Sequence, residues 1–573
     1  MMEPRLSEQQ NLAGLLWQYY QEAPDRPALT MLFSKANDVQ LSFRELINGS
    51  AAYAKALAAS GVQPGEVVIL ILQHSCDLVF AFWGTILYGA IPSIMPFLTE
   101  KLLPDHYRLG LEALLKITSP SGVITYADFV DEVVSAAQNA PTIRSILSAE
   151  TVSPISSIDP EVLAGLDRAS DDIVLLQHSS GTTGLQKGVA LSHKSVLNQI
   201  KSYSDALQLN SSDVIVSWLP LYHDMGLIAG FILPILTQIH LVLLSSFDWV
   251  RAPYRLMQAV SNYRGTLCWL PNFAYNFCSQ KIRPRDLEKV DLSSLRAVIN
   301  CSEPMHWRSH QLFLETFKPY GLSSSALATC YAMAENVFAV TQGGIRTPVV
   351  IDTIDAASFT TQQVAIPVDV SANDDPGKYI VMLSAGRAID GTQLRIVDSQ
   401  GNDVPERCIG EIALYSDCML SGYYHRPDLT EKAFINGWYL TGDLGYLADD
   451  ELFVTGRKKD LIIVGGKNVY PQDLERLASE VEGVHPGRVV AFGIYNDATG
   501  TEDVILIAEI DQYENMSETD RENLNTLIRQ RVTQGSDVAL RFVKLVERNW
   551  LLKTSSGKIA RTANRDKYLQ ENK

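Results

Sequence analysis

The sequence predicts an α/β protein in which layered α/β subdomains are followed by a small β-rich subdomain. Short apolar runs rich in β-branched residues, at positions 67–72, 172–176 and 214–216, alternate with longer helical patterns such as residues 43–60. This alternation is typical of parallel α/β layers. After about residue 394 the pattern changes to short strands and turns, among them residues 410–414 and 445–447, which is typical of an antiparallel or barrel-like subdomain.

Length and composition exclude several classes of protein. The chain has 573 residues, of which 46% are hydrophobic and 20% charged, so we expect at least two domains. A net charge of −17 argues against a general nucleic-acid binder, which needs a basic surface. The seven cysteines show no C-x-x-C spacing, so neither a zinc site nor a disulfide framework is expected. Residues 1–5 do not lead from a basic region into an apolar one, so no signal peptide is expected and the predicted location is cytoplasmic.

One run, residues 225–247, carries no formal charge over 23 positions. That length would permit a membrane span. The run is interrupted, however, by Gly226, Gly230, Pro234, Thr237, Gln238 and His240, so we do not predict a span. We expect Pro234 to separate a buried helix from a strand at His240–Leu244.

The segment LLQHSSGTTGLQKG at positions 175–188 is the strongest functional signal. Glycines let a backbone approach a polyanion, hydroxyls and free amides donate to its oxygens, and a lysine adds a positive charge. The P-loop pattern does not fit, because Lys187 is followed by Gly188 and not by Ser or Thr. The residues expected to bind nucleotide phosphates are Ser179, Ser180, Gly181, Thr182, Thr183, Gly184 and Lys187.

This loop resembles the phosphate loop of the adenylate-forming enzymes, the superfamily of acyl-CoA synthetases, luciferases and peptide-synthetase adenylation domains. Further motifs similar to those of the superfamily follow in order: SWLP at 217–220, HDMGL at 223–227, YAMAE at 331–335, YLTGD at 439–443, GRKKD at 456–460 and KTSSGKIAR at 553–561. The resemblance implies an N-terminal adenylation domain over residues 1–459, with its β-rich subdomain at about 394–459. It also implies a small, mobile α+β domain over 460–573, with a hinge at Asp460.

Within the superfamily, HDMGL, PNFAY at 271–275 and YPQDLE at 470–475 are most similar to the fatty acyl-AMP ligases. These enzymes activate fatty acids as adenylates and transfer them to acyl carrier proteins. Glu335 and Gly386 are 51 positions apart, and the extra stretch at about 347–378 resembles an insertion thought to hinder rotation of the small domain.

The resemblance implies a role for each matching residue. Lys558 would be the catalytic lysine that bridges the carboxylate and the α-phosphate, and His223 would lie between the nucleotide and acyl sites. Glu335 and Ser179 would hold Mg²⁺ on ATP, a hard cation that prefers oxygen ligands. Tyr331 would stack on adenine, and Asp443 and Arg457 would take the ribose hydroxyls. The remaining assignments are Ser302 and Ala332 to the nucleotide pocket and Met225, Phe231 and Phe273 to the acyl pocket.

A hydrolase triad built on His223 and Asp224 is not expected. Adjacent residues cannot easily place a carboxylate behind the neighbouring imidazole, and no G-x-S-x-G motif is present. Departures from the family pattern are Gln186, His178, Ala332 and the segment NCSEP at 300–304. None removes a charged or metal-binding group.

The sequence therefore predicts ATP-dependent formation of an acyl-adenylate from a fatty acid, then acyl transfer to the phosphopantetheine thiol of an acyl carrier protein or of a polyketide or peptide synthase carrier domain. A basic patch at residues 281–289 or 457–459 would serve an acidic carrier, although solvated surface charge is the simpler interpretation of both. Alternatives are a long-chain fatty acyl-CoA synthetase, a luciferase-like oxygenase and a non-catalytic acyl-nucleotide binder. The sequence alone does not identify the acid, the carrier or the oligomeric state.

Overall fold

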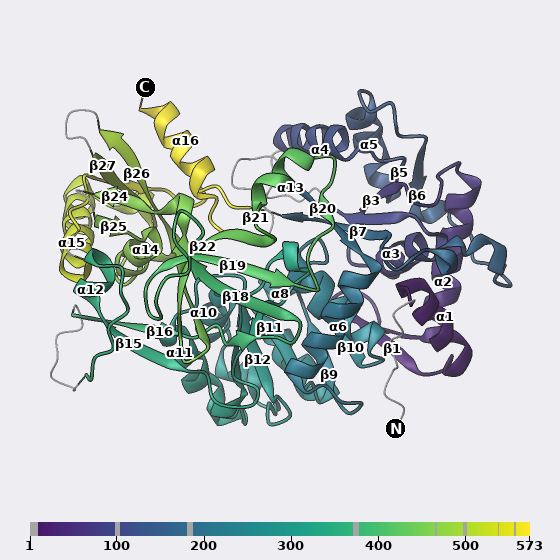
Figure 1. Cartoon of the computed structure of the whole chain (residues 1–573), viewed down its shortest axis with the longest axis horizontal. Coiled ribbons are helices and arrows are strands. Elements are labelled where there is room, and N and C mark those ends of the chain that lie inside the picture. The colour runs from purple at the N-terminus through teal and green to yellow at the C-terminus, as the bar shows by residue number, and fades with distance from the viewer. Residues whose placement is uncertain are drawn as a thin grey trace.

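The computed structural model describes residues 10–97, 104–179, 187–370, 378–464, 467–496, 501–536, 538–554 and 557–572. It has a large N-terminal part and a smaller C-terminal part, which lies at the left of Figure 1. This arrangement confirms the predicted α/β class with a β-rich subdomain and a small α+β domain. No helix among the described residues is long and apolar enough to cross a membrane.

Two parallel sheets form the layered part of the large domain. The larger is parallel except at its edge strand β2, and in order it contains β13 (Leu327–Cys330), β12 (Ala297–Cys301), β11 (Leu267–Leu270), β9 (Val214–Ser217), β10 (His240–Leu244), β1 (Pro27–Leu32) and β2 (Val39–Ser42). The smaller contains β4 (Ile91–Ile94), β3 (Val67–Ile71), β5 (Gly122–Thr125) and β6 (Ser145–Ser148), all parallel.

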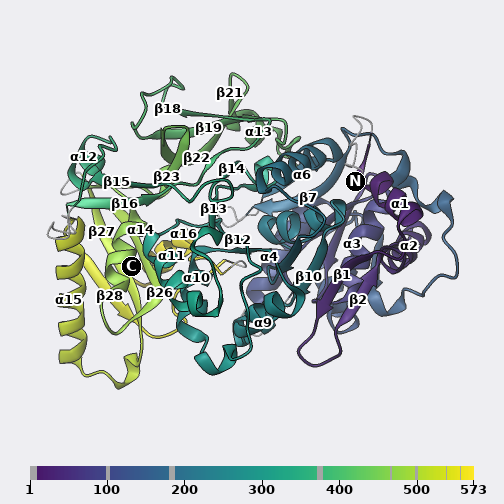
Figure 2. The same ribbon diagram turned by 90° about the horizontal axis from the view of Figure 1, so that it is seen from below.

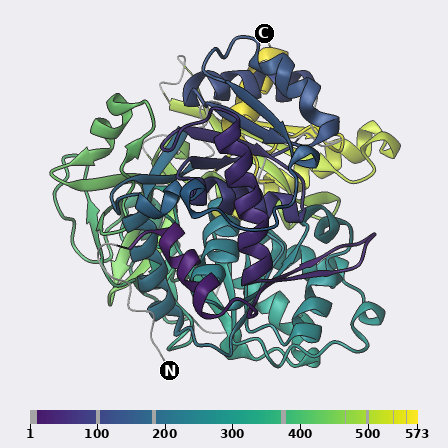
Figure 3. The ribbon, with the colours of Figure 1, turned by 90° about the vertical axis from the view of Figure 1, so that its right-hand side faces the viewer.

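Helices cover these sheets, and Figure 3 shows α1 and α2 in front when the molecule is seen from its N-terminal side. The predicted helix at 43–60 forms as α2, where Ser42 and Glu45 make reciprocal cap hydrogen bonds. The helices of this part are α1 (Leu12–Glu22), α2 (Phe43–Ala59), α3 (Cys76–Tyr88), α4 (Pro104–Thr118), α5 (Val130–Ala137), α6 (His193–Leu207), α7 (Leu233–Leu236), α8 (Ser246–Arg251), α9 (Tyr254–Tyr263), α10 (Asn272–Lys281) and α11 (Trp307–Phe317).

The charge-free run is buried in this core. Its strand matches the prediction, since β10 spans His240–Leu244. The helix before this strand differs from the prediction. A π-helical segment, Met225–Ile232, continues directly into α7, and Pro234 therefore does not end the helix. Pro234 is the second residue of α7, directly after the π-helical segment. The break comes after Leu236, at Gln238, whose φ is positive.

Antiparallel strands complete the large domain. The three-stranded sheet β20 (Gly422–Tyr423), β8 (Lys187–Ser192) and β7 (Ile173–Ser179) frames the phosphate loop. The β-rich subdomain contains β18 (Thr392–Val397), β19 (Gly410–Ser416), β22 (Trp438–Ala448), β21 (Phe434–Ile435), β23 (Glu451–Arg457) and α13 (Pro427–Ala433), and a short pair, β14 (Thr341–Gln342) and β17 (Arg387–Ala388), precedes it.

The stretch at 347–378 adds structure of its own. Strand β15 (Ile351–Asp355) pairs antiparallel with β16 (Tyr379–Leu383), and the short helix α12 (Ala356–Thr361) follows β15. Figure 2 shows α12 beside the small domain, and α12 contacts its strand β25.

The small domain begins after the turn Lys458–Asp460 and has its own buried core, which runs from Ile462 to Leu540. It contains β24 (Ile462–Val464), β25 (Lys467–Val469), α14 (Pro471–Ser479), β26 (Val484–Asn496), β27 (Thr501–Ile510), α15 (Glu518–Ser536), β28 (Phe542–Val546) and α16 (Arg561–Glu571). The separate core supports Asp460 as the boundary, and that assignment stays a prediction.

Candidate active site

The predicted phosphate loop connects β7 to β8. Ser180, Gly181, Thr182, Thr183 and Gly184 lie outside the described residues, as does the side chain of Ser179. Lys187 is described at the start of β8, where its Nζ lies 4.7 Å from the centroid of the Tyr423 ring. Strand β20 carries Tyr423 and pairs with β8, so the end of the loop is fixed against the tyrosine.

Tyr423 joins this loop to the predicted metal ligand. Its hydroxyl lies 2.9 Å from Glu335 Oε1, to which it donates, and 2.9 Å from the hydroxyl of Tyr439. Burial raises the pKa of Glu335 above its ordinary value, and the Tyr423 hydrogen bond and the Lys187 charge only partly oppose the rise. Glu335 is therefore a desolvated carboxyl that would gain from a nearby cation.

The predicted adenine and ribose residues Tyr331, Asp443 and Arg457 lie together. The Tyr331 hydroxyl donates to Asp443 Oδ2 at 2.7 Å, and Arg457 Nε lies 3.2 Å from Asp443 Oδ1. Asp443 and Arg457 are register partners on β22 and β23. Ser302 directly follows β12 with a left-handed φ of 68°. Ala332, which follows Tyr331, makes an antiparallel bridge to Ala339.

His223 and Asp224 do form a pair, and the expectation that neighbours cannot do so is wrong. His223 Nδ1 lies 2.5 Å from Asp224 Oδ1. Asp224 has helical backbone angles at the start of the π-helical segment, and its carboxylate also accepts from the Met225 amide at 2.8 Å. Among the described contacts no serine hydroxyl accompanies this imidazole, so the pair does not constitute a hydrolase triad.

The charge of Lys558, a small-domain residue, acts on Asp224 of this pair. Burial alone would raise the pKa of Asp224, but the charges of His223 and Lys558 hold that pKa below its ordinary value. Glu303 also senses Lys558. Burial raises the pKa of Glu303, and Lys558 together with a 3.0 Å hydrogen bond from the Phe273 amide opposes the rise. The charge of Lys558 therefore acts on two carboxyl groups of the large domain, Asp224 and Glu303, and its catalytic role stays a prediction.

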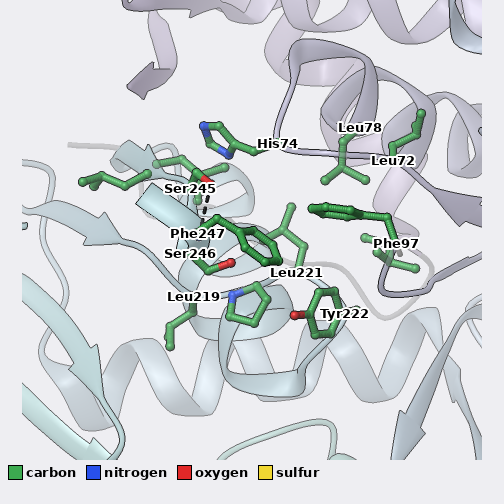
Figure 4. A pocket seen from close by; sticks show the side chains of 14 residues that line it. Leu72, His74, Leu78, Phe97, Leu219, Leu221, Tyr222, Ser245, Ser246 and Phe247 are labelled. Atoms are coloured by element: carbon green, nitrogen blue, oxygen red, sulfur yellow. Dashed lines mark hydrogen bonds between the residues drawn. The ribbon is translucent and has the colours of Figure 1, made fainter. Parts of the chain in front are cut away.

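The predicted acyl-pocket residues lie in different surroundings. Phe231 is fully buried against the Phe82 ring at 5.5 Å, and Met225 is 3% exposed. Phe273 is half-buried, with its ring edge-on to Trp218 and to Trp249 of α8. None of the three lines the cavity shown in Figure 4, so their assignment to the acyl pocket stays a prediction.

That cavity lies where the two parallel sheets meet and adjoins the segment that leads into His223 (Figure 4). The rings of Phe97 and Phe247 pack against each other at this cavity, with centroids 5.1 Å apart and planes tilted by 46°. Most of the lining is apolar. The complete lining is Leu72, His74, Leu78, Ile94, Phe97, Leu219, Pro220, Leu221, Tyr222, Leu243, Leu244, Ser245, Ser246 and Phe247.

Sequence reasoning missed Tyr423, Tyr439, Glu303 and the cavity residues. Tyr439 opens the YLTGD motif and Glu303 lies in the NCSEP segment, so their motifs could have drawn attention to them. Tyr423 and Phe247 stand in segments without a motif signal, and only the fold brings them to the site.

The two candidate basic patches differ. Arg457 and Lys458 are paired with Asp443 and Glu411, the latter at 2.8 Å. Burial and the Arg457 charge lower the pKa of Lys459 to about 8. Arg457 and Lys458 are therefore ion-paired, although residues 457–459 are all exposed. Residues 281–289 include exposed Lys281, Arg285 and Lys289.

Comparison with known proteins agrees with this geometry. The family model described as AMP-binding enzyme matches residues 16–424. The chain is 30% identical over 573 residues to the medium-chain fatty acid–acyl carrier protein ligase JamA of Moorena producens, covering 96% of this chain and 93% of JamA. It is 28% identical to the 4-hydroxyphenylalkanoate adenylyltransferase of Mycobacterium tuberculosis strain H37Rv, covering 98% and 92% of the two chains.

Solved structures agree as well. A structure from a study of fatty acyl-adenylate ligases of E. coli and L. pneumophila superposes with a TM-score of 0.87 at 28% identity, covering 98% of both chains. The family match extends over well over half of the residues and includes the phosphate loop, Glu335 and the His223 motif. This chain belongs to the AMP-binding enzyme family.

Proposed function

We propose that this protein activates a fatty acid with ATP and transfers the acyl group to the phosphopantetheine thiol of a carrier protein. In the first step a carboxylate oxygen attacks the α-phosphorus, and the bond to the bridging oxygen breaks as pyrophosphate leaves. In the second step the thiol sulfur attacks the acyl carbonyl, the thiol proton is lost, and AMP leaves with the electron pair of its bond to the acyl carbon.

One observation carries the proposal. Lys558 comes from the small domain, yet its charge acts on Asp224 and Glu303 of the large domain, beside His223. A lysine positioned between an acyl site and a nucleotide site can stabilise the negative charge on both reactants. A preorganised donor of this kind contributes about 3–4 kcal/mol to lowering the barrier.

The nucleotide residues have complementary tasks in this proposal. Lys187 would add charge to the phosphates at the end of the loop. Tyr331 would lie against adenine, and Asp443 would exchange its present partners for the ribose hydroxyls. The apolar cavity beside Leu221 and Phe247 would receive part of the alkyl chain, since its lining is largely hydrophobic.

The donor set fits a magnesium–nucleotide complex. Mg²⁺ is usually held by one or two carboxylates together with substrate phosphates and water. Glu335 offers a half-buried carboxyl group on which the Lys187 charge acts, and the described residues contain no cluster of three His, Cys, Asp or Glu that would bind a metal without a nucleotide. When bound, the ion would neutralise charge on the phosphates, with Glu335 and Ser179 as its protein ligands.

The carrier thiol is preferred over coenzyme A because of residues 347–378. Asp352 in this stretch accepts from Arg407 and from the Tyr446 hydroxyl, both at 2.8 Å, which anchors it to the β-rich subdomain. Phe359 of α12 packs on Tyr470 of the small domain, with ring centroids 5.5 Å apart. These contacts support a role for the stretch in restricting rotation of the small domain.

The cytoplasmic location and the hinge role of Asp460 belong to the same proposal.

The decisive experiment is mass-spectrometric detection of acyl-AMP after mixing the protein with ATP, Mg²⁺ and a panel of fatty acids, with and without coenzyme A. We expect acyl-AMP that persists with coenzyme A and is consumed by a phosphopantetheinylated carrier. Efficient conversion to acyl-CoA would favour the long-chain acyl-CoA synthetase instead. Light emission or oxygen consumption would indicate an oxygenase, and no adenylate from any acid would refute the proposal.

Lys558→Ala tests the assignment of the catalytic residue. We expect acyl-AMP formation to fall by about 10²- to 10³-fold, because the variant lacks the charge that would bridge the carboxylate and the α-phosphate. Lys567→Ala is the matched control, since it removes a lysine from the small domain that lies over Trp550 at 3.8 Å. Unchanged adenylate formation in Lys558→Ala would show that the assignment is wrong.

A further inference from the structure

Arg561 connects three separate segments at the predicted hinge. Its Nη1 lies 2.7 Å from Asp460 Oδ2, and its Nη2 lies 2.7 Å from Glu475 Oε1 on α14. Its Nε donates to the backbone carbonyl of Ala491 on β26 at 2.9 Å. All three guanidinium nitrogens are therefore engaged, and a planar guanidinium with three fixed partners has a single orientation.

The partners of Arg561 are themselves fixed. Glu475 Oε1 also accepts from the Ala491 amide at 2.8 Å, so Arg561, Glu475 and Ala491 form a closed set of hydrogen bonds. The side chains of Arg561, Asp460 and Glu475 are 19%, 15% and 18% exposed. Ion pairs shielded to this degree depend on geometry more than exposed surface pairs do, because losing one partner leaves a charge in a poorly solvated place.

Arg561 also begins the helix that supports the Lys558 turn. Thr554 N donates to the Lys558 carbonyl at 2.8 Å, and Ala560 N donates to Leu552 O at 3.0 Å, so the chain folds back on itself around this lysine. Asn564, one turn into α16, is fully buried. It accepts from Leu552 N and donates to Leu552 O, both at 2.8 Å. The Lys558 turn is thus anchored to the start of α16, next to Arg561.

A continuous path therefore runs from Asp460 through Arg561 to the turn that carries Lys558. Asp460 is the last residue of the short helical turn at the boundary, whereas Glu475 and Ala491 lie within the small domain. Among these partners only Asp460 lies at the boundary itself, before the core of the small domain begins at Ile462. The Asp460–Arg561 ion pair is consequently the contact that a rotation at this boundary would change, while the bonds to Glu475 and Ala491 can travel with the small domain.

We propose that Arg561 is a positioning residue whose ion pair with Asp460 latches the small domain in the orientation that presents Lys558 to the adenylation site. The inference rests on the function proposed above and adds a residue to it. Adenylate formation should require the latch, because a small displacement of the charged group from the reacting atoms costs rate steeply. Acyl transfer from a ready-made adenylate should not require it.

The test compares the two half-reactions in Arg561→Gln and Arg561→Lys. With Arg561→Gln we expect acyl-AMP formation to slow by about 10- to 100-fold, whereas transfer from supplied acyl-AMP to a phosphopantetheinylated carrier stays within about twofold. Arg561→Lys keeps the charge but cannot reach three partners at once, so we expect an intermediate loss. Asp460→Asn should give the same split, and the double variant Asp460→Asn with Arg561→Gln should be no slower than the slower single variant.

Arg531→Gln is the matched control, because Arg531 pairs with Glu480 on the small domain at 41% side-chain exposure and contacts neither Asp460 nor the Lys558 turn in the described contacts. It should leave both half-reactions unchanged. Equal losses in both half-reactions of Arg561→Gln, or no loss in adenylate formation, would overturn the inference. Absence of acyl-AMP from the unmodified protein would instead refute the proposed function, so the two failures are distinguishable.

Discussion

At the scale of single residues, Glu335 illustrates how a functional group opposes stability. Its pKa is raised because burial disfavours the charged form, and the Tyr423 hydroxyl and Lys187 compensate only in part. A carboxyl whose pKa is higher in the folded state than in the unfolded state destabilises the fold at pH values above both. The protein keeps this charge in place, which is understandable if a cation joins it during the reaction.

Glu335→Gln should therefore separate activity from stability. Gln can still accept from the Tyr423 hydroxyl but carries no charge, so we expect the melting temperature without nucleotide at pH 8 to be unchanged or higher. Acyl-AMP formation should fall by about 10²-fold, with a higher Mg²⁺ requirement. Calorimetry and a Mg²⁺ titration of adenylate formation check both. A lower melting temperature with normal Mg²⁺ dependence would mean that Glu335 is structural.

At the scale of elements, helix α12 connects the inserted stretch to the small domain. Phe359 is 3% exposed and shares a buried cluster with Tyr470 and with Tyr446 and Phe453 of the β-rich subdomain. Asp352 anchors the same stretch independently through Arg407. A change at Phe359 can therefore loosen the contact with the small domain while the stretch stays attached.

We expect Phe359→Ala to gain coenzyme A activity without losing adenylate formation. Acyl-CoA formation should rise about tenfold or more, because the lost packing, about 3–5 kcal/mol for a buried Phe, weakens one contact that opposes rotation. Deleting residues 347–378 should have the same effect, but it also removes β15, the strand partner of β16. Acyl-CoA is measured by mass spectrometry.

Phe317→Ala controls for general destabilisation, since Phe317 is fully buried on α11, outside the cluster that contains Phe359. It should lower the melting temperature without producing acyl-CoA. If both variants remain unable to form acyl-CoA, the contact of α12 with the small domain does not decide the choice of thiol.

The elements also show how far sequence reasoning extends. Strand β10 matches its predicted bounds because four consecutive apolar residues follow His240 and form a buried parallel strand. Helix α12 was not predicted, since its sequence, AASFTT, is short and has no helical periodicity. In the site, Lys558, Glu335 and Asp443 stand in local motifs. Arg561 also stands in such a motif, but its partners Asp460 and Glu475 lie 101 and 86 positions away in the sequence. Only the folded structure shows that these residues are in contact.

At the scale of the whole molecule, the two domains meet where α14 approaches the start of α11. Burial and the Arg476 charge lower the pKa of His306, which precedes α11, to about 4. Burial raises the pKa of Asp473, in the first turn of α14, to about 6, although Arg476 opposes the rise. The charge of Arg476 therefore acts on His306 across the domain boundary.

Asp473→Asn tests the energetic cost of this carboxylate. Because the pKa of Asp473 is raised in the folded state, the folded protein binds the proton more tightly, and the charge destabilises the fold above about pH 6. Between pH 6 and pH 4 the folded state takes up the proton and the cost diminishes. Asp473→Asn should therefore raise the melting temperature by roughly 1–3 °C at pH 8, and the gain should shrink toward zero near pH 4. Asp511→Asn, an exposed change on the same domain, should shift the melting temperature little. A gain that is constant with pH, or a loss at pH 8, would show that Asp473 does not carry a buried charge at the domain contact.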